Sequence, residues 1–188
     1  IAITHGKGAL LYDENGNEYI DAVSSWWTNL FGHANSQIAA AIKKQVDTLE
    51  HVIFAGFTHQ PAIELSEKLI QLLPKNQSKV FFSDNGSTCV EVALKMAIQY
   101  WHNQHIEKTT IIAFKNAYHG DTFGAMSVGA RGVFNQPFES YMFDVSFLDL
   151  PTDDNFEQVL ADFQQIIQSN KATAFIFEPL IQGSAGML

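Results

Sequence analysis

The stretch FFSDNGST, residues 81–88, has the composition of a strand that turns directly into a helix. Residues 80–82 form a short apolar run, which predicts a buried strand. Residues 84–86 follow with turn chemistry, and the glycine among them allows a backbone geometry or a close approach that a side chain would obstruct. Ser87 or Thr88 then stands where the cap of a helix is expected.

The residues after this turn predict an amphipathic helix that ends near residue 101. Its apolar positions fall at helical spacing and form one face: Val90, Ala93, Leu94, Ala97, Ile98 and Trp101. The first turn of such a helix presents free N–H groups and the positive end of the helix dipole, so it can bind an anion beside a Ser/Thr hydroxyl. The alternative is a capped crossover that binds nothing. The stretch matches neither the P-loop nor the GxGxxG pattern.

The composition indicates an α/β protein of the cytoplasm. The chain is 46% hydrophobic and has 15 phenylalanines, enough for a substantial core. A net charge of −9 and a single arginine argue against nucleic acid as a partner. The only cysteine, Cys89, excludes an internal disulfide and fits a reducing compartment. No apolar run is long enough to span a membrane, so we expect no membrane partner.

The first thirty residues predict a β-hairpin followed by a segment without a regular period. Asn15-Gly16 lies between two alternating runs, which is a strong short-range hairpin signal. Residues 22–30 fit neither the helical nor the strand period. Within them, Trp26 and Trp27 cannot both face one core in an extended chain, because successive side chains alternate. We expect one of them to line a cleft or an interface; the alternative is a hydrophobic clamp.

The rest of the chain alternates helices with short apolar strands, which predicts a mainly parallel sheet with helices on both faces. We expect helices at 36–49, with Ser36 as the cap, at about 59–73 and at 155–169, a short helix or turn at 123–128, strands at 109–114 and 174–179, and mostly loop over 130–153. Ligands bind such sheets beyond the carboxyl ends of the strands. Three polar, glycine-bearing loops should converge there: residues 83–88, 116–122 and 178–186.

The second of these loops carries the most chemistry. Residues 118–121, YHGD, offer an aromatic face, an imidazole and a carboxylate. They make a poor nucleophile site, but Tyr118 can stack on a planar ring, with a satisfied loop Tyr–His pair as the alternative. Glu178 ends the last strand. A carboxylate at this place is more often functional than structural, with a structural ion pair as the alternative. The seven histidines form no cluster at ligand spacing, so we expect no metal site.

Five motifs, in this order, resemble those of the class III, pyridoxal-phosphate-dependent aminotransferases. They are SSWW at 24–27, FTHQPAIEL at 57–65, DNGS at 84–87 with VEVALK at 90–95, YHGDTFGAMS at 118–127 and EPLIQG at 178–183. The resemblance covers nearly the whole chain and implies an α/β fold of fold type I, with an incomplete large domain and an N-terminal β-hairpin segment. It implies a division into residues 1–33, the N-terminal segment, and 34–188, the first half of the domain that binds pyridoxal 5′-phosphate (PLP). It also implies a homodimer that acts on small molecules.

The resemblance implies a role for individual residues. Gly86 and Ser87 would hold the phosphate of PLP, in agreement with the anion site above. Tyr118 would stack on the pyridine ring and border the substrate, and Glu178 would lie near the edge of the cofactor. His119 and the carboxylate two residues later would have supporting roles.

The substrate is implied by two further features. Trp26 and Trp27 would line the substrate pocket, and together with residues 118–127 they favour the branch of the family that acts in biotin biosynthesis. That branch transfers an amino group from S-adenosylmethionine to 8-amino-7-oxononanoate, giving 7,8-diaminononanoate. A long apolar acceptor fits an aromatic pocket. The alternatives are a class III enzyme acting on ω-amines, ornithine or 4-aminobutyrate, a non-catalytic protein that keeps the fold, and a generic phosphate-binding α/β domain.

The family's catalytic residues are expected outside these 188 residues. In the family, an aspartate that pairs with the pyridine nitrogen, a lysine that forms the Schiff base and an arginine that binds the substrate carboxylate all come later than the match to Glu178. No aspartate, lysine or arginine follows Glu178 here. A substrate-binding tyrosine would precede Ile1, and the lysine would lie beyond Leu188. We therefore expect transamination from a longer parent protein and none from this piece alone.

Overall fold

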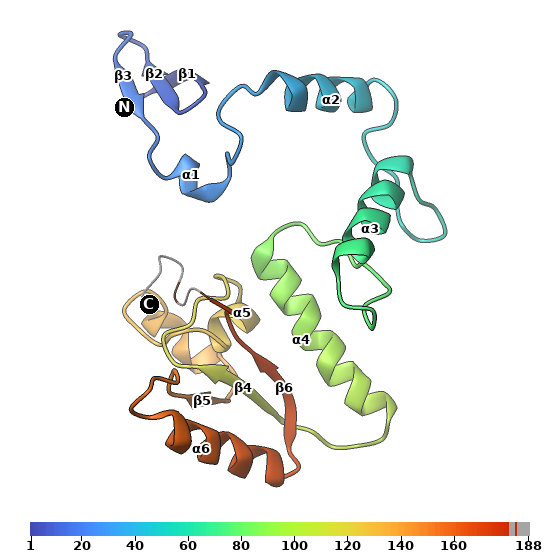
Figure 1. Cartoon of the computed structure of the whole chain (residues 1–188), viewed down its shortest axis with the longest axis vertical. Coiled ribbons are helices and arrows are strands. Elements are labelled where there is room, and N and C mark those ends of the chain that lie inside the picture. Colours follow the sequence, from blue (N-terminus) through green and yellow to red (C-terminus); the bar gives the residue numbers. More distant parts are fainter. Residues whose placement is uncertain (181–182, 184–188) are drawn as a thin grey trace. The chain divides into compact units, whose positions relative to one another are not determined.

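A computed structural model describes residues 1–180 and 183 of the chain. Its elements fall into two units that divide between Val80 and Phe81 (Figure 1). The boundary at residues 33–34, which the sequence suggests between an N-terminal segment and the large domain, stays a prediction.

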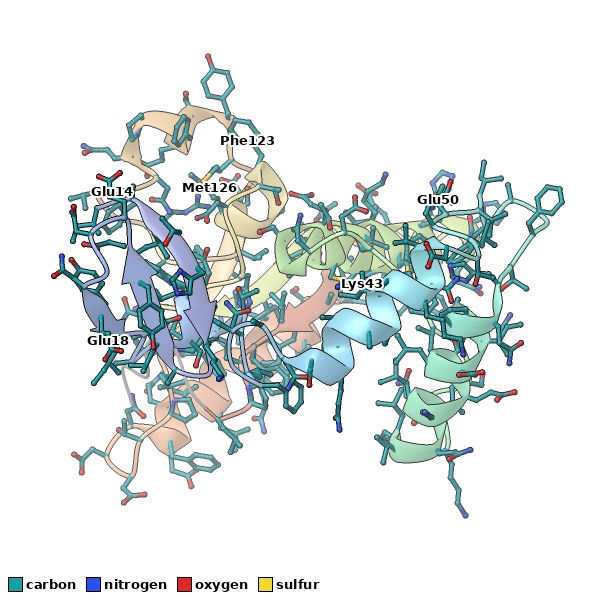
Figure 2. The ribbon with its side chains drawn as sticks, turned by 90° about the horizontal axis from the view of Figure 1, so that it is seen from above. Glu14, Glu18, Lys43, Glu50, Phe123 and Met126 are labelled. Atoms are coloured by element: carbon teal, nitrogen blue, oxygen red, sulfur yellow. The ribbon has the colours of Figure 1, made fainter. Side chains whose placement is uncertain are left out.

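The first unit opens with an antiparallel sheet in the order β1-β2-β3. Its strands are β1, Ile3–Lys7, β2, Leu10–Asp13, and β3, Glu18–Ile20. The predicted hairpin is confirmed, with Gly16 at a φ of 80° in its turn. The carboxylate of Asp13 closes the turn by accepting hydrogen bonds from the N–H of Asn15 and the hydroxyl of Tyr19, both at 2.9 Å. Glu14 and Glu18 extend from the hairpin into solvent (Figure 2).

The first unit also contains two regular helices. They are α2, Ser36–Val46, and α3, Gln60–Leu72. The predicted cap at Ser36 is wrong by one residue, because the side chain of Asn35 accepts the free N–H groups of Gln37 and Ile38. The start of α3 is confirmed, with His59 as the cap and Pro61 in the first turn.

Residues 22–30, which have no period in the sequence, contain a single turn, α1, Ser24–Trp27. The turn is left-handed: the φ angles of its four residues are 50°, 48°, 62° and 65°. Periodicity cannot predict such a turn, because all of its residues are ones that favour the right-handed region.

The second unit is built on a parallel sheet in the order β5-β4-β6. The strands are β4, Thr110–Phe114, β5, Val145–Leu148, and β6, Ala172–Ile176; the helices are α4, Gly86–Asn103, α5, Phe123–Ser127, and α6, Phe156–Gln168, with a 3-10 turn, η1, at Gln136–Tyr141. One face of the central strand packs Ile111 and Ala113 against α4 and the end of α5. The other face packs Ile112 against α6, so helices cover both faces, as predicted (Figure 1).

Three details of the sequence prediction for this unit are wrong. Residues 80–82 form no strand, and Phe81 and Phe82 are 64% and 37% exposed, unlike the residues of a central strand. β6 begins and ends earlier than residues 174–179. β5 lies inside the stretch expected to be mostly loop, where a run of only four residues gives little periodic signal.

Candidate functional site

The site is built on the first turn of α4. Asn85 caps this helix: its side chain accepts the N–H of Thr88 at 3.0 Å, and the Thr88 hydroxyl oxygen accepts the N–H of Asn85 at 3.1 Å. This reciprocal pair is a capping box, so the expected cap at Ser87 or Thr88 is wrong. In the part of the chain that the structure describes, the N–H groups of Gly86 and Ser87 meet no acceptor. They are the two unpaired donors of a helix N-terminus.

Gly86 leaves open space in front of these donors. A Cβ atom added to it would meet no atom within 4 Å. Its φ is not positive, so the backbone geometry does not require glycine here. Of the two roles that the sequence suggests for this glycine, only close approach of another group remains. An anion that approached the free N–H groups would occupy this space.

The loop at 116–122 is held against α4 through Ser87. Gly120 has a φ of +125°, and a Cβ atom on it would lie 2.1 Å from the Oγ of Ser87. Glycine is therefore required both for the backbone conformation and for the close approach. The N–H of Asp121 donates to the same Oγ at 3.2 Å. Since the oxygen accepts this bond, the hydroxyl proton of Ser87 stays available for another acceptor.

Tyr118 combines a fixed hydroxyl with an accessible ring. The hydroxyl donates to Oδ2 of Asp121 at 2.7 Å, and the side chain is 46% exposed. The hydrogen bond to this carboxylate, together with partial burial, raises the pKa of Tyr118 above its ordinary value. The ring is thus held in one orientation while a face stays free to stack on a planar group.

Glu178 joins the second loop to the third. Its Oε2 accepts the N–H of Tyr118 at 3.2 Å and the N–H of Gly183 at 2.9 Å. With the bond between Ser87 and Asp121, this carboxylate brings together all three loops, as the sequence predicts, although no strand precedes the first of them. Residues 181–182 and 184–186 of the third loop lie outside the described residues.

His119 is a half-buried imidazole whose neutral form is favoured. Burial lowers the pKa of its imidazole, and the charge of Glu178 opposes that effect only in part. Its Nε2 is buried and has no hydrogen-bond partner among the described residues. The ring therefore contributes to the second loop a buried nitrogen that is unpaired within the described part of the chain, with its neutral form favoured.

Glu91 is a residue of the site region that the sequence analysis missed. Its Oε1 accepts the N–H groups of Gly124 at 2.6 Å and Ala125 at 3.3 Å, and so ties the start of α5 to α4. A Cβ atom on Gly124 would lie 2.3 Å from the carboxylate, so the glycine makes room for it. The first residue of α5, Phe123, precedes the glycine that donates to Glu91 and is labelled in Figure 2. The available signal was a carboxylate three residues before buried Leu94, on the same side of the helix.

The two tryptophans expected at the substrate belong to the first unit. Trp26 and Trp27 are 78% and 52% exposed, and their rings meet edge to face at 6.4 Å. They form a pair of accessible apolar rings, and their assignment to the substrate stays a prediction.

Residues 1–180 and 183 contain neither a cluster of metal ligands nor a helix that could span a membrane. In that range, no three His, Cys, Asp or Glu side chains gather closely enough to bind a metal ion. The helices there are also too short or too polar to cross a bilayer.

Comparison with known proteins identifies the family. All of residues 1–188 match the model of the family described as aminotransferase class-III. A protein from Synechococcus elongatus named adenosylmethionine-8-amino-7-oxononanoate aminotransferase is 52% identical over 195 residues, covering 100% of this chain and 46% of that protein. A protein of the same name from Staphylococcus aureus is 40% identical, with 100% and 45% covered. The chain thus spans about half the length of the curated relatives it matches.

Solved structures agree with this assignment. The aminotransferase of the same name from Methanocaldococcus jannaschii superimposes with a TM-score of 0.89 at 39% identity, covering 100% of this chain and 43% of that one. A PLP-bound amine transaminase from an uncultivated Pseudomonas species gives a TM-score of 0.85 at 29% identity, with 97% and 45% covered. The chain therefore belongs to the class III aminotransferases, and its fold is that of the PLP-dependent transaminases of fold type I.

Proposed function

We propose that the protein containing this chain is a PLP-dependent aminotransferase of biotin biosynthesis. It would transfer the amino group of S-adenosylmethionine to the ketone of 8-amino-7-oxononanoate and release 7,8-diaminononanoate. The observation that carries the proposal is that two backbone N–H groups at the start of α4 have no acceptor among the described residues. Open space lies before them, and Tyr118 lies in the adjoining loop. The choice of substrates is supported by the relatives at 52% and 40% identity that are named for this reaction.

The residues of the second unit fit a planar ring that bears a phosphate. The N–H groups of Gly86 and Ser87, the hydroxyl of Ser87 and the positive end of the α4 dipole would hold the phosphate. The exposed face of Tyr118 would stack on the ring, and Glu178 would lie at its edge. When bound, PLP supplies the electron sink that amino-group transfer requires.

The chain's own residues would fix and orient the reactants. Asp121 accepts the hydroxyl of Tyr118 at 2.7 Å, which favours one orientation of the stacking ring. Glu178 holds the backbone of the same residue at 3.2 Å, which ties the loop to the segment that follows β6. None of residues 1–188 would be catalytic, and the Schiff-base lysine would belong to a later part of the protein.

We also propose that the protein is a cytoplasmic homodimer. The single cysteine, which can form no internal disulfide, supports a reducing compartment such as the cytoplasm. The segment between α5 and β5 exposes apolar side chains that a partner would bury, including Val133, Phe134 and Tyr141. A sedimentation measurement on the purified protein tests this: a monomer at micromolar concentration contradicts it.

The reaction is tested with the purified protein, PLP and a panel of donors and acceptors. The proposal expects 7,8-diaminononanoate by mass spectrometry with S-adenosylmethionine as the donor, and little product from ornithine or 4-aminobutyrate. Transfer from ornithine, 4-aminobutyrate or simple ω-amines, with none from S-adenosylmethionine, would favour another class III enzyme. Absence of any PLP absorbance from the pure protein would favour a non-catalytic one.

A further inference from the structure

The left-handed turn α1 is a strained arrangement that needs an explanation. Four successive residues, Ser24–Trp27, have φ angles between 48° and 65°, and none is glycine. Residues other than glycine are destabilised in this region, because their Cβ comes too close to the following carbonyl oxygen. Such backbone persists only where the surrounding structure holds it, and it concentrates at functional sites.

The carboxylate of Asp21 holds this turn. Its Oδ1 accepts the N–H of Ser25 at 2.8 Å, and its Oδ2 accepts the hydroxyl of the same residue at 2.7 Å. The side chain of Asp21 is only 6% exposed. The hydrogen bonds from Ser25, followed by that with His33, lower the pKa of Asp21 to about 2. At neutral pH it is therefore an ionised acceptor with both oxygens engaged by the turn.

His33 holds the carboxylate from the other side. Its Nε2 lies 2.7 Å from Oδ2 of Asp21. The backbone of His33 is itself paired with Gly8 by two hydrogen bonds of 3.0 and 2.8 Å. A Cβ atom on Gly6, at the end of β1, would lie 2.8 Å from the Cβ of His33, so the glycine lets the ring approach. The β-sheet thus fixes His33, which fixes Asp21, which fixes the turn.

The turn places two neighbouring indole rings together. In an extended chain, Trp26 and Trp27 would point to opposite sides. In the left-handed turn their rings lie 6.4 Å apart, edge to face, and both are accessible. The strain therefore produces a double aromatic surface that no ordinary strand could present.

We propose that Asp21 and His33 are positioning residues for the substrate. They hold the left-handed turn so that Trp26 and Trp27 stand as a preformed clamp for a long apolar chain, such as that of an amino-oxo acid. This rests on the proposed function, since it takes the tryptophan pair to contact the acceptor. The clamp lowers the cost of binding because its rings are ordered before the substrate arrives.

The test compares Asp21→Asn with the double variant Asp21→Asn/Ser25→Gly in the full-length protein. Asparagine keeps the shape but weakens the hold on Ser25, so KM for the acceptor should rise about tenfold, the loss expected for a hydrogen bond to a charged group. The rate of the half-reaction with the amino donor should not change. Glycine adopts the left-handed conformation without a steric penalty. The double variant should therefore bring KM for the acceptor most of the way back to that of the unaltered protein.

The matched control is Asp13→Asn. Asp13 is a similarly engaged carboxylate in the same unit, but it closes the hairpin and does not contact the turn. It should lower the melting temperature without raising KM for the acceptor. An equal rise of KM in this variant would mean that Asp21 acts only through general stability, and would overturn the proposal.

A second readout does not depend on activity. Indole rings this close give an exciton couplet in the circular dichroism spectrum, which Asp21→Asn should weaken and the double variant restore. If the couplet and KM both stay unchanged, or the couplet falls while KM for every acceptor stays unchanged, the proposal is wrong. If the unaltered protein transfers no amino group, the proposed function fails separately, and an unchanged couplet would still refute the positioning.

Discussion

Replacing Gly120 by alanine tests how the second loop is held against α4. At this position φ is +125°, and the added Cβ would lie 2.1 Å from Oγ, 2.7 Å from Cβ and 2.9 Å from Cα of Ser87. Contacts this short with the Cβ and Cα atoms of Ser87 cannot be relieved by rotating its side chain. Either the loop moves away from α4, or the first turn of α4 is displaced.

The expected size of the effect follows from two terms. Holding a residue other than glycine in this backbone region costs about 1–3 kcal/mol. Forcing a methyl group into a filled space costs about 1–3 kcal/mol more. If about 2 kcal/mol of this total falls on the bound state, the affinity for PLP drops about 30-fold. The bond between the N–H of Asp121 and Ser87 is lost in the same movement.

The assay is a titration of the cofactor-free protein with PLP, followed by absorbance, together with thermal unfolding. Gly132→Ala is the matched control, because a Cβ atom there meets nothing within 4 Å and its φ is not positive. Gly120→Ala should weaken binding and lower the melting temperature, while the control should do neither. PLP binding within twofold of the unaltered protein in Gly120→Ala would refute the close packing of this loop on Ser87.

Three further outcomes are expected. Glu91→Ala should release the start of α5 and cost about 1–3 kcal/mol of unfolding free energy for the two unpaired amides, measured by urea denaturation, whereas Glu91→Gln should recover part of it. Tyr118→Phe keeps the stacking ring but loses the bond to Asp121, so PLP affinity should fall less than in Tyr118→Ala; equal losses would contradict the stacking role. Because the pKa of Asp21 is lowered to about 2 in the fold from 3.8, its stabilising effect is complete above about pH 4 and lost as the pH falls through 2, so Asp21→Asn should flatten the acid-unfolding curve in that range.

The sequence was sufficient to predict the parallel sheet and the edge where the loops meet. The strand around Ile112 is a continuous apolar run, and that pattern occurs when helices cover both faces. Since loops after parallel strands emerge at one edge, the meeting of Tyr118, Asp121 and Glu178 followed from their order, whereas Ser87 follows no strand and joins them at the start of α4. The cap of α4 was misplaced because Asn85, Ser87 and Thr88 are all good capping residues, and only the hydrogen bonds decide among them.

Other features leave no trace in local sequence patterns. The left-handed turn at Ser24–Trp27 depends on Asp21 and on His33, which lies twelve residues from that aspartate. The bonds of Glu91 to α5 span more than thirty residues, and no periodicity encodes them. Such features arise from packing between distant segments, so they become visible only in the structure.

The central claim is that the free N–H groups at the start of α4 bind the phosphate of PLP. The most direct measurement is the affinity of Gly86→Ala for PLP, taken with its melting temperature. The added methyl group points into open space, so the protein should stay as stable as before, while the space that the phosphate needs is filled and the dissociation constant rises about tenfold or more. An unchanged dissociation constant in a protein of unchanged stability would contradict the claim and place the phosphate elsewhere.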